Sequence, residues 1–238
     1  MDIANYTTLS RQVGLMREMN LIANNIANAT TTGYRQQGLI FSEYLTKGSE
    51  SNLVSMANGN VPKTSFTQGA FQQTGNPLDV AIEGDGFFLI DTPQGERLTR
   101  SGSFFLSSDG NLITAQGFAV LDQAQTKIFM PPDAKEINIA SDGTLSADGQ
   151  IFGKIALVKP AGSQDVTRED GVKFAFQDAV MPAENNRVLQ RFLENSNTDP
   201  LQQIARMIEV QRAYEMGQSF LTAEDERIKK AIDILSTK

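Results

Sequence analysis

The hydrophobic and polar positions of the chain follow three different patterns. Over the first 30 residues, apolar residues recur three and four positions apart, which is the spacing of an amphipathic α-helix. They form two neighbouring stripes: Ile3, Tyr6, Leu9, Val13 and Met16, then Leu15, Met19, Ile22 and Ile26. Together the stripes make an apolar surface broader than a two-stranded helical seam requires. The pattern predicts an N-terminal helix with a broad apolar face.

The last zone, from about residue 188, is predicted to be a second helix. Asp199 supplies a capping residue and Pro200 a proline at the first helical position. Ten later positions then alternate three and four apart, and seven of them are apolar: Ile204, Met207, Gln211, Tyr214, Gln218, Leu221, Asp225, Ile228, Ile232 and Leu235. This heptad rhythm predicts a coiled coil. At about 1.5 Å per residue the helix would be about 55–60 Å long. One compact monomer offers such a helix little to pack on, so we expect partner subunits.

The middle of the chain, roughly residues 36–190, has the pattern of β-structure. All but three of the 19 glycines lie in it. Short apolar or alternating runs predict strands at 78–82, 86–90, 112–114, 137–139 and 151–159. Asp-Gly pairs, which suit hairpin turns because both residues tolerate positive φ, begin at Asp85, Asp109, Asp142, Asp148 and Asp170. The predicted fold class is therefore α+β, with long N- and C-terminal helices paired in a coiled-coil-like layer and a central all-β domain.

Composition and charge exclude several classes of function. The chain has 238 residues, 40% hydrophobic and 21% charged, which is ordinary for a soluble protein with one large domain or two small ones. Its net charge of −7 is scattered, so no basic footprint for nucleic acid or an anionic membrane is present. No signal peptide is visible at the start, and the longest apolar run, near 86–90, is too short to span a bilayer. General export signals alone indicate the cytoplasm.

The residue types that usually carry catalysis are sparse. The chain contains neither Cys nor His, which removes thiolate nucleophiles, Cys-based zinc sites and the commonest general base. Glu83 and Asp85 flank a glycine, but nothing nearby completes an acid–base site, so a tight turn is favoured. Residues 141–150 lack the oxygen ligands of a calcium loop, 59–65 lack the ending of a phosphate loop, and 99–110 lack a nucleophile motif. We expect no catalytic residue, no cofactor and no metal.

Three motifs, in order, resemble the axial proteins of the bacterial flagellum, those of the rod and hook. Residues 21–37 read LIANNIANATTTGYRQQ and match an ANN-[IL]-AN stretch followed by T-x-G-[FY]-[KR]. Residues 76–90, NPLDVAIEGDGFFLI, and 98–114, LTRSGSFFLSSDGNLIT, are similar to the family's core-domain signature. Residues 193–215, LENSNTDPLQQIARMIEVQRAYE, match its closing motif, E-x-S-N followed by Q-R-[AS]-[YF]-E. Residues from about 115 to 185 carry no signature of the family.

Within the family, the start MDIANYTTLSRQVGLMREMN is similar to the proximal-rod type rather than to the distal-rod or hook type. The resemblance implies a hollow helical assembly, with an inner α-helical layer from both termini and the β domain outside it. The implied division is a helical part at 1–35, a connecting segment at 36–75, a central β domain at 76–180, a return connection at 181–195, and a second helical part at 196–238.

The resemblance also implies a function. The chain would be a structural subunit of the flagellar basal-body rod, serving motility by assembling through its terminal helices and transmitting torque, and it would not be an enzyme. Its partners would be other proximal and distal rod proteins, copies of itself and the flagellar type III export apparatus, with no nucleic acid and no direct membrane insertion. Export without a cleavable signal peptide would place it in the rod within the periplasm, which overrides the cytoplasmic expectation.

Two alternatives remain open at this point. The chain could be a distal-rod or hook-type axial protein, which would be distinguished by the neighbour that it binds. It could instead be a β-domain enzyme or carbohydrate-binding protein carried on a coiled coil. In that case residues 80–180 would form a pocket with convergent carboxylates.

Four asparagines in the N-terminal helix, at positions 20, 24, 25 and 28, need an explanation because the Asn amide competes with helical backbone bonds. We expect them to bond to neighbouring subunits and to fix helix register, while in a free monomer they would meet only water. The alternative is that they solvate one helix face. The predicted assembly interface consists of Leu21, Ile22, Asn24, Asn25, Ile26, Asn28, Ile204, Met207, Gln211, Tyr214, Leu221 and Ile228.

A charged residue in either helical stripe tests this prediction. We expect Ile26→Asp or Leu221→Asp to abolish assembly and to leave the β domain folded, because a carboxylate cannot be buried in an apolar helix contact without a partner. Sedimentation of assembled material and circular dichroism of the monomer measure the two effects. Normal assembly of either variant would contradict the layered arrangement.

Overall fold

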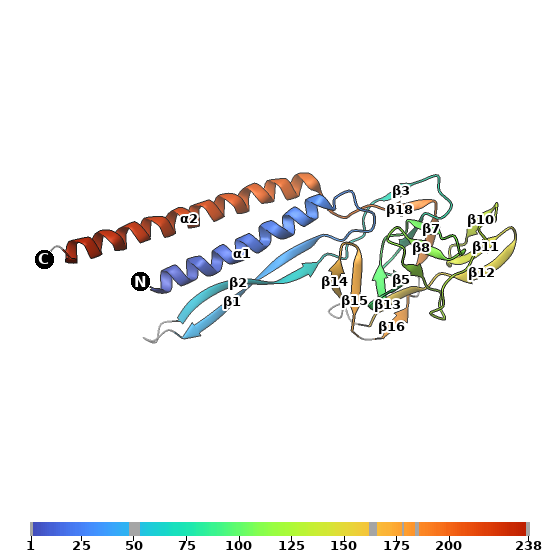
Figure 1. Ribbon diagram of the computed structural model, residues 1–238, viewed down its shortest axis with the longest axis horizontal. Coiled ribbons are helices and arrows are strands. Elements are labelled where there is room, and N and C mark those ends of the chain that lie inside the picture. The colour runs from blue at the N-terminus through green and yellow to red at the C-terminus, as the bar shows by residue number, and fades with distance from the viewer. Residues whose placement is uncertain (1, 48–52, 162–165, 178, 184–185, 237–238) are drawn as a thin grey trace. The chain divides into compact units, whose positions relative to one another are not determined.

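The computed structural model describes residues 2–47, 53–161, 166–177, 179–183 and 186–236. Helix α1 (Asp2–Ala27) lies near the start, helix α2 (Pro200–Ser236) lies near the end, and strands fill the sequence between them (Figure 1). The predicted α+β class with two terminal helices and a β-rich middle is confirmed. The expected return connection at 181–195 includes residues 184–185, which lie outside the described residues.

The strands are short apart from the first two. Their bounds are β1 (Gln37–Lys47), β2 (Leu53–Thr64), β3 (Phe71–Gln73), β4 (Val80–Glu83), β5 (Phe87–Thr92), β6 (Gly95–Thr99), β7 (Phe104–Leu106), β8 (Leu112–Thr114), β9 (Ala119–Val120), β10 (Ile137–Ile139), β11 (Thr144–Ala147), β12 (Gln150–Lys154), β13 (Leu157–Pro160), β14 (Val166–Asp170), β15 (Lys173–Phe176), β16 (Val180–Pro182), β17 (Arg187–Gln190) and β18 (Phe192–Glu194).

The chain divides into two compact units. The helical unit comprises Met1–Ala27, Gln37–Ser65 and Asp199–Lys238, and the β unit comprises Asn28–Gln36 and Phe66–Thr198. Most of the segment expected to be a connection therefore folds with the helices, as the antiparallel hairpin β1–β2, in which Gln37 is paired with Thr64. The sequence pattern did not reveal this hairpin.

In the helical unit, α1 lies between α2 and the β1–β2 hairpin (Figure 1). The start of α2 is determined locally, as the sequence predicts. Asp199 Oδ1 accepts hydrogen bonds from the backbone N–H groups of Leu201 at 2.9 Å and Gln202 at 3.3 Å, which satisfies two of the donors left free at a helix N-terminus. Among the described helices, neither is long and apolar enough to cross a membrane.

The β unit is organised around β5. In the largest sheet of the described residues, β5 pairs with β6 on one side and with β9 and β13 on the other, all antiparallel. Phe88 and Ile90 belong to one buried cluster, and Phe87 and Leu89 to another. Successive residues of a strand point to opposite faces. The run GFFLI is continuously apolar because both faces of β5 are covered.

Two expectations about the β unit need correction. The strand predicted at 151–159 is two strands, β12 and β13. Ile155 still donates to the Gly143 carbonyl, next to β11, whereas Ala156 donates to the Leu121 carbonyl in a different segment. The Asp-Gly turn predicted at Asp85 has its left-handed residue one position earlier, at Gly84, with φ of 113°. The β11–β12 hairpin at 148–149 does have both turn residues at positive φ, as predicted.

A close backbone contact in the β unit provides a stability test. A Cβ on Gly102 would lie 1.7 Å from the carbonyl oxygen of Val80, whereas a Cβ on Gly75 would have nothing within 4 Å. We expect Gly102→Ala to lower the free energy of unfolding by about 1–3 kcal/mol, because the backbone segments around Gly102 and Val80 must move apart. Gly75→Ala should be neutral or should stabilise by up to about 1 kcal/mol through the unfolded state. Urea denaturation measures both, and equal effects would contradict the close contact.

Candidate assembly interface and the buried Glu194 cluster

Three of the sequence motifs meet at one buried carboxylate in the β unit. Glu194 Oε1 lies 2.7 Å from Arg35 Nη2, and Glu194 Oε2 lies 2.9 Å from Arg100 Nη2. Arg100 Nε also donates to Oε2 at 3.0 Å. The relative exposure of each of these three residues is 2% or less. Arg35 is the basic residue of the first motif, Arg100 the arginine of LTRSG, and Glu194 the acid of E-x-S-N. We call these three residues the Glu194 cluster.

Backbone contacts hold the same segments together. The Gly33 N–H donates to the Glu194 carbonyl at 2.8 Å, and the Gly69 N–H donates to Glu194 Oε1 at 3.0 Å. Gly33 has φ of +71°, and a Cβ on it would lie 2.4 Å from the backbone nitrogen of Ser101. Both the left-handed conformation and the close approach require glycine. The glycine of the first motif is therefore explained by its contact with the segment that follows β6.

Burial and pairing act in opposite directions on the two arginines. Desolvation lowers the pKa of Arg100 to about 10, and the charge of Glu194 opposes this effect. Desolvation also lowers the pKa of Arg35, again against the charge of Glu194. Both guanidiniums remain charged at neutral pH. Arg100 also donates to the carbonyls of Ile82 and Gly86, so its buried donors are satisfied.

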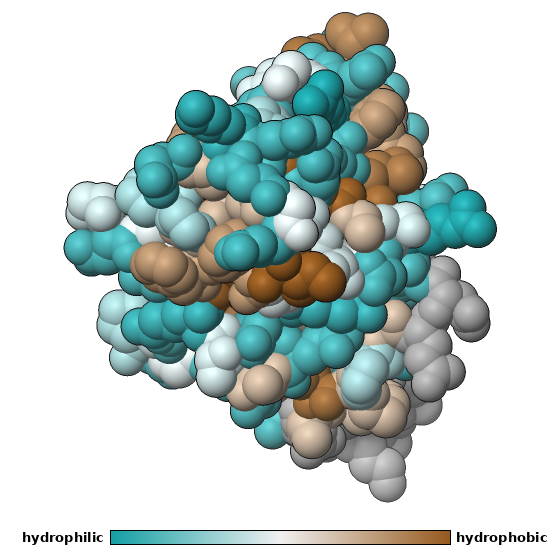
Figure 2. All heavy atoms as spheres, turned by 90° about the vertical axis from the view of Figure 1, so that its right-hand side faces the viewer, coloured by the Kyte–Doolittle hydropathy of each residue, from teal (hydrophilic) through white to brown (hydrophobic). Residues whose placement is uncertain are grey.

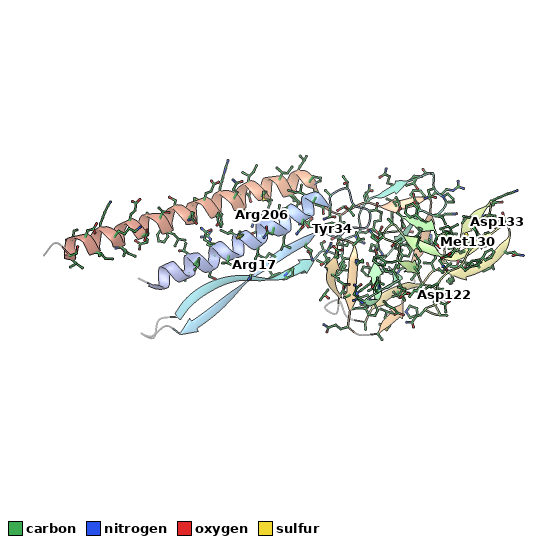
Figure 3. All side chains as sticks on the ribbon, in the orientation of Figure 1. Arg17, Tyr34, Asp122, Met130, Asp133 and Arg206 are labelled. Atoms are coloured by element: carbon green, nitrogen blue, oxygen red, sulfur yellow. The ribbon has the colours of Figure 1, made fainter. Side chains whose placement is uncertain are left out.

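Tyr34, labelled in Figure 3, extends this contact region along the first motif. The guanidinium of Arg168 lies 4.4 Å from the centroid of the Tyr34 ring and 5.0 Å from that of Phe174. Burial raises the pKa of Tyr34, and the charge of Arg168 partly opposes it. Asn197 accepts from the Gln36 N–H at 2.6 Å and donates its own N–H to the Tyr34 carbonyl at 3.3 Å. Residues 33–36 and 194–197 are therefore joined by both side chains and backbone.

In the helical unit, α1 and α2 pack through a small apolar cluster bordered by polar contacts. Leu15, Ile22 and Val210 are buried together. On one side, Glu18 Oε1 lies 2.7 Å from Arg206 Nη2. Elsewhere, Gln12 Nε2 donates to the Tyr214 carbonyl at 2.9 Å.

The expectation that the asparagines meet only water in a monomer is wrong for Asn25. It is 1% exposed, and its Nδ2 donates to the Gln37 carbonyl at 2.7 Å and to Gln203 Oε1 at 3.1 Å. Its Oδ1 accepts from the Gln37 N–H at 3.0 Å. The amide therefore links α1 to β1 and α2 within one chain. Asn24 is exposed, and Asn28 lies in the turn after α1, where its Oδ1 accepts from Thr31.

The packed face of α2 is rotated from the predicted heptad stripe. Most of its residues that are not exposed recur four and three apart, namely Gln203, Met207, Val210, Tyr214, Gly217, Leu221, Glu224 and Ile228, and Ala213 is also partly buried beside them. The predicted stripe shares only every second position with this face, since Ile204 and Gln211 are exposed. A polar Gln203 and a small Gly217 were not recognised as contact positions. A Cβ on Gly217 would lie 2.1 Å from Gln12 Nε2, so a larger residue there would displace the end of the Gln12 side chain.

α2 extends past α1, and the part beyond α1 contains exposed apolar residues. Asn25 contacts Gln203 and Gln12 contacts Tyr214, so the helices run antiparallel, and α2 has 37 residues against 26 in α1. Figures 1 and 3 show the last turns of α2 beyond the first residues of α1, with side chains projecting into open space. Ile232 is 58% and Leu235 78% exposed. We call residues 229–236, which are all exposed, the overhang of α2.

The structure brings some of the predicted interface residues together and leaves others apart. Ile22, Ile26, Met207 and Tyr214 share the apolar cluster, and Asn25 contacts α2 through Gln203. Leu21, Leu221 and Ile228 are half-buried, Asn24, Ile204 and Gln211 are exposed, and Asn28 lies after α1. Sequence reasoning missed the Glu194 cluster. Its signal was present, because each motif contains one charged residue of the cluster among small or apolar neighbours.

Comparison with known families identifies a class, the structural axial proteins of the bacterial flagellum. Residues 3–35 match the model of the flagella basal body rod protein, residues 81–147 that of the flagellar hook protein FlgE/F/G D1 domain, and residues 189–234 that of the flagellar basal body rod FlgEFG protein C-terminal region. These ranges contain Arg35, Arg100 and Glu194. The matched proteins are structural subunits and not enzymes.

Similar proteins extend the match over nearly the whole chain. The chain is 34% identical to a flagellar basal-body rod protein FlgF of Caulobacter vibrioides, covering 99% of this chain and 98% of the relative. It is 33% identical to FlgF of Mesorhizobium japonicum, covering 98% of each, and 29% identical to FlgG of Bacillus subtilis, covering 96% and 97%. The chain belongs to the family of flagellar basal-body rod proteins. Among these relatives it is more like those named FlgF.

The Glu194 cluster generates a stability prediction. Glu194→Gln removes the charge that both buried arginines face, and we expect a loss of about 3–5 kcal/mol in the free energy of unfolding. Glu169→Gln is the matched control, because Glu169 also pairs with an arginine, Arg97, but at the surface. Exposed pairs contribute little, so this variant should unfold like the unmodified chain. Urea denaturation compares them, and a Glu194→Gln chain as stable as the control would refute the role of the cluster.

Proposed function

We propose that the chain is a proximal-rod subunit that assembles through α1 and α2 into a coiled-coil-like helical layer shared with adjoining subunits. The observation that carries the proposal is the overhang of α2. Leu235 continues the spacing of the packed face, and Ile232 lies beside it on the predicted heptad stripe; both are exposed because α1 does not extend far enough to cover them. Contiguous exposed apolar surface of this kind marks a protein–protein contact.

The energetics support a partner for this surface. Burying a side chain the size of Ile232 or Leu235 stabilises a contact by about 1.5–3 kcal/mol relative to leaving it in water. On α1, Leu9, Val13 and Met16 are also large apolar residues with about half of their surface exposed. Both helices therefore present apolar side chains outside their mutual contact. Repetition of such contacts along a rod would supply the stiffness that torque transmission requires.

The proposed partners are other proximal and distal rod proteins and further copies of this chain. Membership of the rod family supports export through the flagellar type III apparatus and a position in the rod within the periplasm. In this arrangement the Glu194 cluster ties together the chain segments that enter and leave the β unit. A force on the β unit would then reach both helical segments rather than one.

The overhang provides the sharpest test of assembly. We expect the double variant Ile232→Asp, Leu235→Asp to fold as a monomer with unchanged thermal stability, because both side chains are already exposed. It should fail to restore swimming in a host whose own copy is deleted. Ala223→Asp is the matched control, since Ala223 is exposed and lies on the opposite side of α2 from Leu221 and Ile228.

Two results would contradict the proposal. Full swimming with the double variant would show that the overhang has no partner. Equal loss of swimming with Ala223→Asp would show that charge anywhere on α2, and not the apolar positions, disturbs the rod. Circular dichroism of each purified variant excludes simple unfolding as the cause.

A further inference from the structure

A pocket of about 340 Å³ lies between α1 and α2, within the helical unit. Four residues of α1, from Thr8 to Leu15, and four of α2, from Ala213 to Phe220, line it. In each helix these residues occupy positions i, i+3, i+4 and i+7, which form one face of a helix over two turns. The pocket therefore follows both helices, as a docking site for a third helix does. We call it the α1–α2 pocket.

The lining of the pocket is mostly apolar or small. Leu15 is buried between the helices, whereas Met216 and Phe220 keep 67% and 47% of their surface exposed. Gly217 has no side chain, which leaves space in the pocket. Among the described residues of the lining, Arg11 alone is charged, and it is exposed. Its guanidinium can stay in water while its aliphatic stem contacts an apolar partner.

The same chain carries a largely exposed helix face of the same length. Ile228, Ile232 and Leu235 occupy positions i, i+4 and i+7 of α2, which again span two turns. Ile232 is 58% and Leu235 78% exposed. Covering these side chains with the apolar lining of a pocket would remove them from water. We call these three residues the end stripe of α2.

The charges beside the end stripe are paired within α2. Arg227 Nε lies 2.5 Å from Glu224 Oε2, and Lys229 Nζ lies 2.6 Å from Asp225 Oδ2. A helix that docks through the end stripe would therefore bring these charges to the pocket as neutral pairs, which avoids the cost of burying an unpaired charge. The end stripe and the α1–α2 pocket agree in charge as well as in length.

The end stripe cannot fill the pocket of its own chain. Gly217 and Ile232 lie on one continuous helix, roughly 20 Å apart at about 1.5 Å per residue. A continuous helix does not fold back on itself, so the occupant of the pocket is a separate molecule. A second copy of this chain carries a face that fits it.

We propose that the α1–α2 pocket of one copy binds the end stripe of α2 of a second copy. The inference rests on the proposed assembly through α1 and α2, and it adds the receiving site and its occupant. The pocket and the end stripe are different surfaces, so a copy whose pocket is filled still has a free end stripe. The contact can therefore repeat from copy to copy instead of ending at a dimer.

Disulfide formation between introduced cysteines tests this contact without background, because the chain contains no Cys. One full-length variant carries Met216→Cys in the pocket, and another carries Leu235→Cys in the end stripe. We expect their mixture, oxidised with glutathione disulfide at high protein concentration, to form the mixed dimer at least fivefold faster than a mixture of Met216→Cys with Lys230→Cys. Lys230 is the matched control, because it is exposed in the overhang on the opposite side of α2 from the end stripe. Mass spectrometry of the linked peptides identifies the mixed dimer.

A second substitution in the pocket separates docking from chance collision. Phe220→Asp, added to the Met216→Cys chain, should slow the mixed disulfide at least fivefold, because the carboxylate would have to be buried without a partner. Thr222→Asp, at an exposed position on the opposite side of α2 from the pocket, should leave the rate unchanged. Circular dichroism should show the same helix content in both, because Phe220 and Thr222 are already exposed.

Two results would overturn the proposal: equal rates with Leu235→Cys and Lys230→Cys, or an unchanged rate with Phe220→Asp. The proposed function is tested separately, by the swimming of the Ile232→Asp, Leu235→Asp variant. Loss of swimming in that variant without a specific link between Met216→Cys and Leu235→Cys would leave the helical layer standing. It would overturn the second copy as the occupant and would assign the end stripe to a different rod protein.

Discussion

The arrangement of the β unit depends on the removal of Glu194 from water between Arg35 and Arg100. A buried carboxylate is costly unless nearby cations and hydrogen-bond donors replace its hydration, and here two guanidiniums and the Gly69 N–H do so. The three charged residues come from distant parts of the sequence. Glu194 offsets the burial of both arginines, and the two guanidiniums together offset the burial of Glu194, so the segments that carry the three residues must converge. Gly33 and its close backbone contact follow from the same convergence.

The helical unit uses polar contacts for a related purpose. Asn25 contacts Gln37 and Gln203, and Glu18 contacts Arg206. These contacts fix the position of α1 along β1 and α2. A shift of one helical turn would leave these buried groups unpaired, which is how polar residues specify register. Much of the apolar surface of α2, by contrast, faces away from α1. In the proposed rod, polar contacts would order the single chain and apolar contacts would join it to others.

This division of roles agrees with a structural protein. The Glu194 cluster uses its charged groups for pairing inside the fold. Of the two carboxylates considered for an acid–base site, Glu83 ends β4 and Asp85 lies in the bend before β5. These features agree with membership of the rod family, because a rod subunit depends on the strength and number of its contacts.

The sequence by itself determined what depends on neighbouring residues or on a repeating pattern. Helical spacing, the Asp199 cap and the Asp-Gly turns predicted two terminal helices around a β-rich middle, and three motifs placed the chain in its family. Tertiary structure alone decided which residues meet. The β1–β2 hairpin joins the helices because its strands pair with each other and pack on α1, and the strand predicted at 151–159 divides where Ala156 bonds to a different segment. The packed face of α2 includes Gln203 and Gly217, which a hydrophobicity pattern cannot select. Whether a polar residue is buried depends on the partner that the fold brings to it, and that partner is distant in the sequence.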